Sequence, residues 1–233
     1  RLARNEYQIA PGAVRNAIPA FGLAVRENHQ PVSLALLKNY VAQNEGLLLR
    51  YMIGDSASFV LVVPAVGEPR LVPLTLDKQQ AQALKASSNG AMHDQLLAEI
   101  MRGDDGVLKL FRKSRALAVE EQLAARLAVL WKVLIPEPER QALTSGEVKR
   151  LMVVADHDLA MLPFEALVVD NAGEATYLLD VGPPIVYGPS ATVLYNLSQR
   201  TALAKQGPQQ VLTVGDPLYN AAPAAAADRA APS

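Results

Sequence analysis

The sequence contains no cysteine among its 233 residues. A disulfide, a thiolate metal ligand and a cysteine nucleophile are therefore all excluded for this chain. Neither sign of charge is in excess, because the net charge is −1 and the pI is about 6.4. No basic field exists to hold nucleic acid or an anionic membrane. Aromatic residues make up only 5% of the chain, which also argues against a base-stacking surface.

Long apolar runs are also missing. No stretch approaches the roughly 18–20 apolar residues of a membrane span, and no signal segment opens the chain. We therefore expect a cytoplasmic protein with neither membrane nor nucleic acid as a partner. The chain begins at Arg1 rather than Met, which suggests a piece of a longer parent protein. Half of the residues are hydrophobic, so a sizeable core is expected, in one large domain or two small ones.

The apolar pattern predicts the α/β class, with a β-meander and a mixed sheet flanked by helices. Residues 1–31 are expected to be irregular, a linker to an upstream region. A helix is predicted over 32–46, with Ser33 as its cap, Leu34, Leu37 and Val41 on one face, and Gly46 at its end. Strands are predicted at 47–53, 58–64 and 70–74, the first two joined by a Gly-Asp-Ser turn.

The second half of the chain alternates helices with short strands. Residues 77–102 are predicted to be helical with a break near 88–90, followed by a loop at 103–106. The best helix covers 115–135, where Trp131 lies on one apolar stripe and Pro136 ends the helix. The continuous apolar run at 150–155 predicts a strand covered on both faces. A helical turn is expected at 163–167 and a helix after Ser190. Further strands are expected at 176–179, 185–188 and 209–217. The Ala/Pro-rich tail at 220–233 is expected to be disordered.

Asp156-His157-Asp158 is the first candidate for chemistry. A metal site would need three converging ligands, and a catalytic acid or base would need a nucleophile partner. Adjacent residues on a strand-to-helix turn point in different directions. We therefore interpret the cluster as a polar turn, in which Asp can cap the helix that starts near Pro163.

The remaining candidates are weaker. Ser190 lies in Gly-Pro-Ser-Ala-Thr, which lacks the second glycine of a hydrolase elbow, and is interpreted as a helix cap. Gly215-Asp216-Pro217 is interpreted as a turn, and His29 and His93 as solvent-exposed side chains. No nucleotide-binding motif occurs. No residue is assigned to catalysis, to a cofactor or to a metal.

Four stretches, in this order and spacing, resemble the CHAT family, whose caspase-like domains are related to separase and often follow tetratricopeptide repeats. The two specific stretches are RLMVVADHDLAMLPFEAL (150–167) and YLLDVGPPIVYGPSATVL (177–194). The other two are LLLRYMIGDSASFVLVV (47–63) and VLTVGDPLY (211–219). The resemblance places an N-terminal, non-catalytic part of a CHAT domain at 32–219. By this resemblance, Asp156-His157-Asp158 matches a structural turn of that family. Two residues depart from the family's turn, since Ala155 replaces the usual proline and His157 the usual glycine, and both are tolerable in a turn.

The resemblance implies a parent with a catalytic His and Cys on later strand ends, and neither motif occurs here. Three hypotheses follow. The chain is the scaffold of a CHAT cysteine peptidase, whose partners are its catalytic half, upstream tetratricopeptide repeats and a protein substrate. Alternatively, it is a catalytically inactive interaction module, or an unrelated hydrolase fragment with Ser190 as nucleophile. A partial domain would also leave open the sheet edge where the catalytic half docks, so concentration-dependent association is expected.

Overall fold

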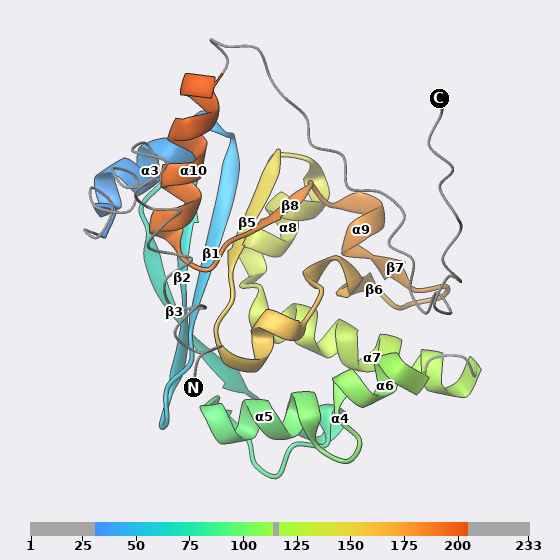
Figure 1. Ribbon diagram of the computed structural model, residues 1–233. Helices are drawn as coiled ribbons and strands as arrows, with labels where there is room; N and C mark the ends of the chain where they lie inside the picture. The colour runs from blue at the N-terminus through green and yellow to red at the C-terminus, as the bar shows by residue number, and fades with distance from the viewer. Residues whose placement is uncertain (1–30, 114–116, 205–233) are drawn as a thin grey trace, which may run out of the picture.

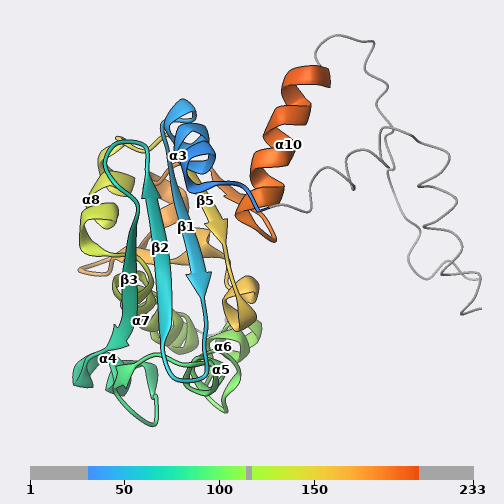
Figure 2. The ribbon, with the colours of Figure 1, turned by 90° about the vertical axis from the view of Figure 1, so that its left-hand side faces the viewer.

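A six-stranded mixed sheet forms the centre of the computed structural model, which describes residues 31–113 and 117–204 (Figure 1). The strand order is β4-β3-β2-β1-β5-β8. Helices cover both faces of the sheet, so the layers are α/β/α (Figure 2). The predicted fold class is therefore correct. The predictions for residues 1–30, for the strand at 209–217 and for the tail at 220–233 lie outside the described residues.

One half of the sheet is an antiparallel meander. Strands β1 (Gly46–Met52), β2 (Ser58–Pro64) and β3 (Arg70–Leu76) pair in sequence order, as predicted, and β4 (Gly90–Ala91) adds a short pairing at the end of β3. The tight β1–β2 turn needs Gly54, because a Cβ there would lie 2.7 Å from the carbonyl oxygen of Ala57.

The other half of the sheet is parallel. Strand β5 (Arg150–Val154) pairs with the free side of β1, and β8 (Ile185–Tyr187) pairs with β5. Residues 151–154 are all buried, which confirms the strand covered on both faces. Outside β8, no further strand is found among the described residues.

The two faces differ in size. The larger core packs Leu47, Leu49 and Tyr51 of β1 against the helices that follow the meander. The smaller core packs Leu48 and Met152 against two helices only, α3 (Leu34–Gln43) and α10 (Ala191–Ala204). The helices on the larger face are α4 (Lys78–Leu84), α5 (Asp94–Arg102), α6 (Val107–Lys113), α7 (Leu117–Leu134), α8 (Glu137–Ser145) and α9 (Leu178–Val181).

Several element boundaries differ from the prediction. Ser33 caps α3 as expected, but the helix ends at Gln43 and Gly46 already belongs to β1. Gly46 is needed in that strand, because a Cβ there would lie 3.0 Å from the Met152 side chain. Leu34 is 51% exposed, so its predicted place on the buried face was wrong; the buried residues of α3 are Leu37, Tyr40 and Val41.

Other elements were missed or misassigned. Pro136 ends α7 as predicted, but it also starts α8, because proline fits the beginning of a helix. Helix α6 was also missed. The strand predicted at 176–179 is only the two-residue β7 (Thr176–Tyr177), which pairs with β6 (Val168–Asp170) before α9 begins at Leu178.

Trp131 is buried, with 4% of its surface exposed. It lies in the same core as Leu151 and Val153 of β5, which confirms the predicted packing of the long helix on the sheet. The rest of its predicted stripe is buried too, at Leu123, Leu127, Leu130 and Leu134.

Trp131→Ala is expected to lower the free energy of unfolding by about 3–5 kcal/mol, because truncating a large buried aromatic side chain leaves a cavity. Chemical denaturation followed by circular dichroism measures the loss, and Lys132→Ala at the exposed neighbouring position is the control. The native fluorescence of this single tryptophan should be blue-shifted and poorly quenched by iodide. Emission like that of free tryptophan would contradict the packing.

Candidate functional site

The carboxyl ends of the parallel strands β1, β5 and β8 lie together at one end of the sheet, here called the carboxyl end. In open α/β sheets, ligands bind outside the carboxyl ends of the strands. The two specific sequence stretches both pass through this end: Asp156-His157-Asp158 follows β5, and Tyr187 ends β8. The carboxyl end of the sheet is therefore the candidate functional site.

The Asp156 carboxylate ties the ends of two strands together. Its Oδ2 accepts a hydrogen bond of 3.1 Å from the Ile53 N–H beyond β1. Its Oδ1 accepts one of 3.0 Å from the His157 N–H and lies 3.1 Å from His157 Nδ1. Partial burial raises the pKa of Asp156, but the hydrogen bonds from Ile53 and His157 outweigh it and the net pKa is lowered. The carboxylate thus stays charged as a structural acceptor.

The three residues of the cluster have different partners. His157 has φ of +48°, a left-handed turn conformation, and its side chain is half-exposed. Asp158 accepts a hydrogen bond of 2.9 Å from Arg102 Nε of α5. Asp156 caps the 3₁₀ helix η1 (His157–Met161), so the predicted cap of a helix near Pro163 was wrong. Within the described ranges, no three His, Cys, Asp or Glu residues are placed to hold a metal ion.

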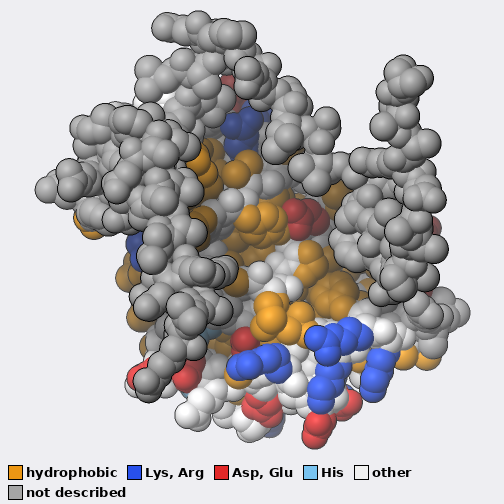
Figure 3. Space-filling model, in the orientation of Figure 1, with side chains coloured by type: hydrophobic (Ala, Val, Ile, Leu, Met, Phe, Trp, Pro, Cys, Tyr) orange, Lys and Arg blue, Asp and Glu red, His pale blue; other side chains and the backbone are white. Residues whose placement is uncertain are grey.

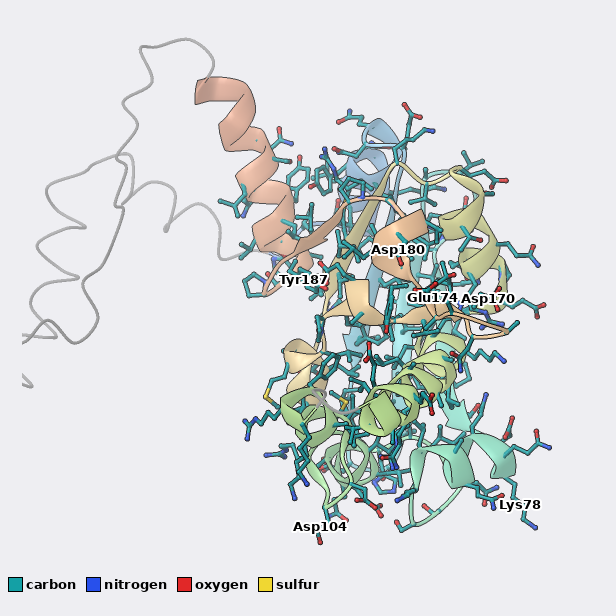
Figure 4. All side chains as sticks on the ribbon, turned by 90° about the vertical axis from the view of Figure 1, so that its right-hand side faces the viewer. Lys78, Asp104, Asp170, Glu174, Asp180 and Tyr187 are labelled. Atoms are coloured by element: carbon teal, nitrogen blue, oxygen red, sulfur yellow. The ribbon has the colours of Figure 1, made fainter. Side chains whose placement is uncertain are left out.

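Tyr187 joins the two specific stretches. Its hydroxyl donates a hydrogen bond of 2.6 Å to Glu165 Oε2 and accepts one of 2.8 Å from the Phe164 N–H. Phe164 and Glu165 belong to the 3₁₀ helix η2 (Phe164–Ala166). Burial, together with the Glu165 carboxylate, raises the pKa of Tyr187, so the phenol stays protonated and acts as a donor. Figure 4 shows Tyr187 beside the start of α10.

A row of aromatic rings runs from Tyr187 into the core. The ring centroids of Phe164 and Tyr187 lie 6.3 Å apart, and those of Phe164 and Tyr51 lie 5.4 Å apart. The buried Tyr51 hydroxyl donates a hydrogen bond of 3.1 Å to the Leu134 carbonyl at the end of α7, and burial raises the pKa of Tyr51. The row therefore links β8, η2, β1 and α7.

The sequence did not single out Tyr187, Glu165 or Tyr51 as a connected set. A signal was present, since the Phe-Glu-Ala-Leu and Tyr-Gly-Pro-Ser stretches both stood out as motifs. Nothing in either stretch, however, says that the tyrosine hydroxyl reaches the glutamate.

The other candidate residues are helix caps. Ser190 Oγ accepts a hydrogen bond of 3.1 Å from the Val193 N–H, which confirms that it caps α10. His93 is half-buried rather than exposed, because it is the N-cap of α5 and its Nδ1 accepts from the Leu96 N–H at 3.4 Å. His29 and Gly215-Asp216-Pro217 lie outside the described residues.

The protein is therefore a mixed α/β protein in which polar residues of the two specific stretches tie loops to the ends of parallel strands. Residues 124–232, just under half of the chain, match the family model of the CHAT domain. The match confirms the resemblance to the CHAT family and is consistent with a caspase-like part. It includes both specific stretches, whereas the meander lies outside it. No curated protein and no solved structure matches this chain. None of the described helices is long and apolar enough to cross a membrane.

His157→Ala is expected to lower the free energy of unfolding by about 1 kcal/mol or less, as for most surface substitutions. His157→Gly should be at least as stable as the unmodified chain, because glycine adopts the left-handed conformation without steric cost. Urea denaturation compares the three proteins. Zinc titration by calorimetry should show no stoichiometric site. Nanomolar zinc binding that disappears in His157→Ala would contradict the structural role.

Tyr187→Phe is expected to destabilise the protein by about 1–2 kcal/mol, since it leaves the Phe164 N–H and the Glu165 carboxylate without their shared partner. Tyr195→Phe is the matched control, because the Tyr195 ring packs edge-on against Tyr40 at 6.0 Å between centroids and that contact needs no hydroxyl. Equal losses in the two variants, measured by urea denaturation, would show that the Tyr187 hydroxyl contributes nothing.

Proposed function

We propose that this chain is the N-terminal, non-catalytic part of a CHAT-type cysteine peptidase and scaffolds a catalytic His/Cys half that this chain does not contain. The observation that carries the proposal is the match to the CHAT domain in a chain without cysteine. The polar groups of its matched motifs, Asp156, Tyr187 and Ser190, are engaged in tying strands, loops and a helix together. They suit a scaffold better than a reaction centre.

The catalytic chemistry belongs to the other half of the parent. There a cysteine thiolate, activated by a histidine, attacks the carbonyl carbon of a peptide bond in a protein substrate. The residues of this chain supply a rigid sheet against which that half is held. Upstream tetratricopeptide repeats are the further partner that the family resemblance suggests, and neither nucleic acid nor a membrane is required.

The outer edge of β8 is the surface we assign to the catalytic half. The Pro184 carbonyl accepts from the Leu151 N–H, and the Gly188 N–H donates to the Val153 carbonyl. Residues 184, 186 and 188 therefore turn their backbone groups toward β5, and Ile185 turns its own outward. An edge strand of this kind is a template for another strand.

Apolar side chains accompany this edge. Hydrophobic atoms gather in the middle of the face that carries β8 (Figure 3). Exposed large apolar residues occur in η1, α9 and β8, namely Met161 at 49%, Leu179 at 71%, Val181 at 43% and Tyr187 at 44%. Covering such a surface favours association.

The alternative is a catalytically inactive protein-interaction module that uses the same edge. The absence of cysteine from this chain favours it equally. The two functions differ in the catalytic half, which holds a His/Cys dyad only in the first. The serine-hydrolase alternative is disfavoured, because Ser190 Oγ is engaged in capping α10.

Proline at position 185 tests the docking edge, because it removes an outward N–H and leaves the β5 pairing intact. In the parent protein, Ile185→Pro is expected to lower peptidase activity at least tenfold. Val72→Pro is the matched control at the opposite edge. Leu74 turns its carbonyl outward to the Met92 N–H, so Val72, two residues away, also faces outward. Circular dichroism and Trp131 fluorescence establish that both variants fold.

Equal activity of Ile185→Pro and Val72→Pro would refute the docking edge. The isolated chain should cleave no member of a broad peptide library, and turnover above that of Ser190→Ala would revive the serine hydrolase. A folded parent without peptidase activity would favour the interaction module.

A further inference from the structure

The outer side of β3 carries backbone groups without a partner strand. Strand β4 pairs antiparallel with β3 only at the last two residues of β3, and the Leu74 carbonyl accepts from the Met92 N–H. Because backbone groups alternate in direction along a strand, Val72 and Arg70 also turn their N–H and C=O groups to this outer side. No strand of the described residues pairs with them there. The edge therefore offers hydrogen bonds to a further strand in line with β4.

The features that usually protect an edge strand do not cover these groups. Proline protects an edge when it removes a donor from the outer side. By the same alternation, Pro73 turns its ring nitrogen toward β2, where it lies opposite Phe59. The side chain of Arg70 forms an ion pair with Glu139 of α8. The outer donors and acceptors of β3 therefore stay open.

A groove of about 400 Å³ lies beside this edge, on the face of the sheet that carries the larger core. Residues 72–75 of β3 form one wall. The other wall comes from the junction of α7 and α8 and from the start of α4, through Lys132, Val133, Pro136, Glu137, Arg140, Asp77 and Gln80. Figure 2 shows β3 at the margin of the sheet, with α7 behind it and α4 at its end.

The charged side chains of the groove balance, because Lys132 and Arg140 are matched by Asp77 and Glu137. Asp77 caps α4, and Arg140 Nη1 donates to carbonyls at the end of α7. The side chains of Lys132 and Glu137 are exposed and have no hydrogen-bond or ion-pair partner among the described residues. One of them donates hydrogen bonds and the other accepts them. The groove therefore suits uncharged polar side chains, whose hydroxyl or amide groups do both.

The opposite face of β3 is apolar. Leu71 is 54% exposed, Pro73 is exposed as well, and they lie beside Leu61 and Phe59 of β2. Figure 2 looks onto this face: α3 lies over β1, and no described helix lies over β3. An apolar side chain on an added strand would pack beside Leu71 and Pro73.

We propose that the outer edge of β3 binds an extended segment of a partner protein as an antiparallel strand, and that this segment alternates polar and apolar residues. The direction follows from β4, which pairs antiparallel with the same edge. The residue opposite Val72 exchanges two backbone hydrogen bonds with it and places its side chain on the same face, in the groove. The polar residues are therefore the ones that bond to β3. The residues between them turn their N–H groups outward and their side chains onto Leu71 and Pro73.

The backbone of such a segment supplies affinity and its alternate side chains supply specificity. The probe is the peptide acetyl-Val-Thr-Val-Thr-Val-amide, titrated into the chain and followed by amide NMR. Saturable shifts at Arg70, Val72 and Lys132 are expected, with a dissociation constant in the millimolar range and slower hydrogen exchange of the Val72 N–H. The peptide acetyl-Val-Val-Thr-Thr-Val-amide has the same composition without the alternation and should bind at least tenfold more weakly.

N-methylation tests which residues of the peptide bond to β3. Methylation of both threonine nitrogens removes the N–H groups that face the edge and should weaken binding at least tenfold. Methylation of the second and third valine nitrogens removes N–H groups that face solvent and should leave binding unchanged. Equal effects of the two modifications, or the reverse order, would overturn the proposed pairing.

Two variants locate the site on the chain. Val72→Pro removes an outer N–H and should weaken peptide binding at least tenfold, whereas Ile185→Pro at the opposite edge of the sheet should leave it unchanged. Leu71→Ser changes an exposed side chain and decides the matter if Val72→Pro does not fold. It should also weaken binding at least tenfold, and Leu179→Ser, an exposed leucine of α9, is its control. Unchanged binding in Leu71→Ser, or equal binding of the peptide without alternation, would overturn the proposal.

Sedimentation of the chain alone distinguishes a partner segment from a second copy of the chain. A dimer that Val72→Pro dissociates would show that the β3 edge is occupied by a second copy, which would overturn the proposal. A monomer, or a dimer that Val72→Pro leaves intact, supports an edge open to a partner. These outcomes are read from binding and not from peptidase activity, so they are independent of the proposed peptidase scaffold.

Discussion

The burial of β5 on both faces is the constraint on which the rest of the structure depends. A strand whose four consecutive residues Leu151–Val154 are all buried needs a neighbour on each side and a helical layer above and below. Strands β1 and β8 supply the neighbours. Helix α7 with Trp131 covers one face, while α3 and α10 cover the other. The antiparallel meander then extends the sheet beyond β1, where covering both faces is less demanding.

Polar residues at the carboxyl end of the sheet fix the loops to the ends of the parallel strands. Each specific stretch contains one parallel strand, β5 or β8. At the end of that strand, each carries a side chain that hydrogen-bonds to a neighbouring segment: Asp156 to Ile53, and Tyr187 to Phe164 and Glu165. The match to the CHAT domain includes both stretches. A motif that looks like chemistry in the sequence can thus be a set of hydrogen bonds between loops.

The meander, the long helix and the buried strand could be predicted because their signals are local: turn residues between β-prone runs, an apolar stripe at helical spacing, and a continuous apolar run. The Ser33 and Ser190 caps were predictable for the same reason. Helix α8 was not, because Pro136 signals both the end of one helix and the start of the next. The Tyr187–Glu165 hydrogen bond spans 22 residues of sequence, and the Asp156–Ile53 hydrogen bond spans 103. No local pattern encodes either of them.

Helix α10 carries a topological consequence. The connection from β5 to β8 runs over the α7 face, through residues such as Leu159, Phe164 and Leu178, whereas α10 lies on the opposite face with α3. Two crossovers that advance in the same direction over opposite faces have opposite hands. A parallel strand outside β8, reached directly through α10, would therefore close a left-handed crossover, which accounts for only about 2% of such connections.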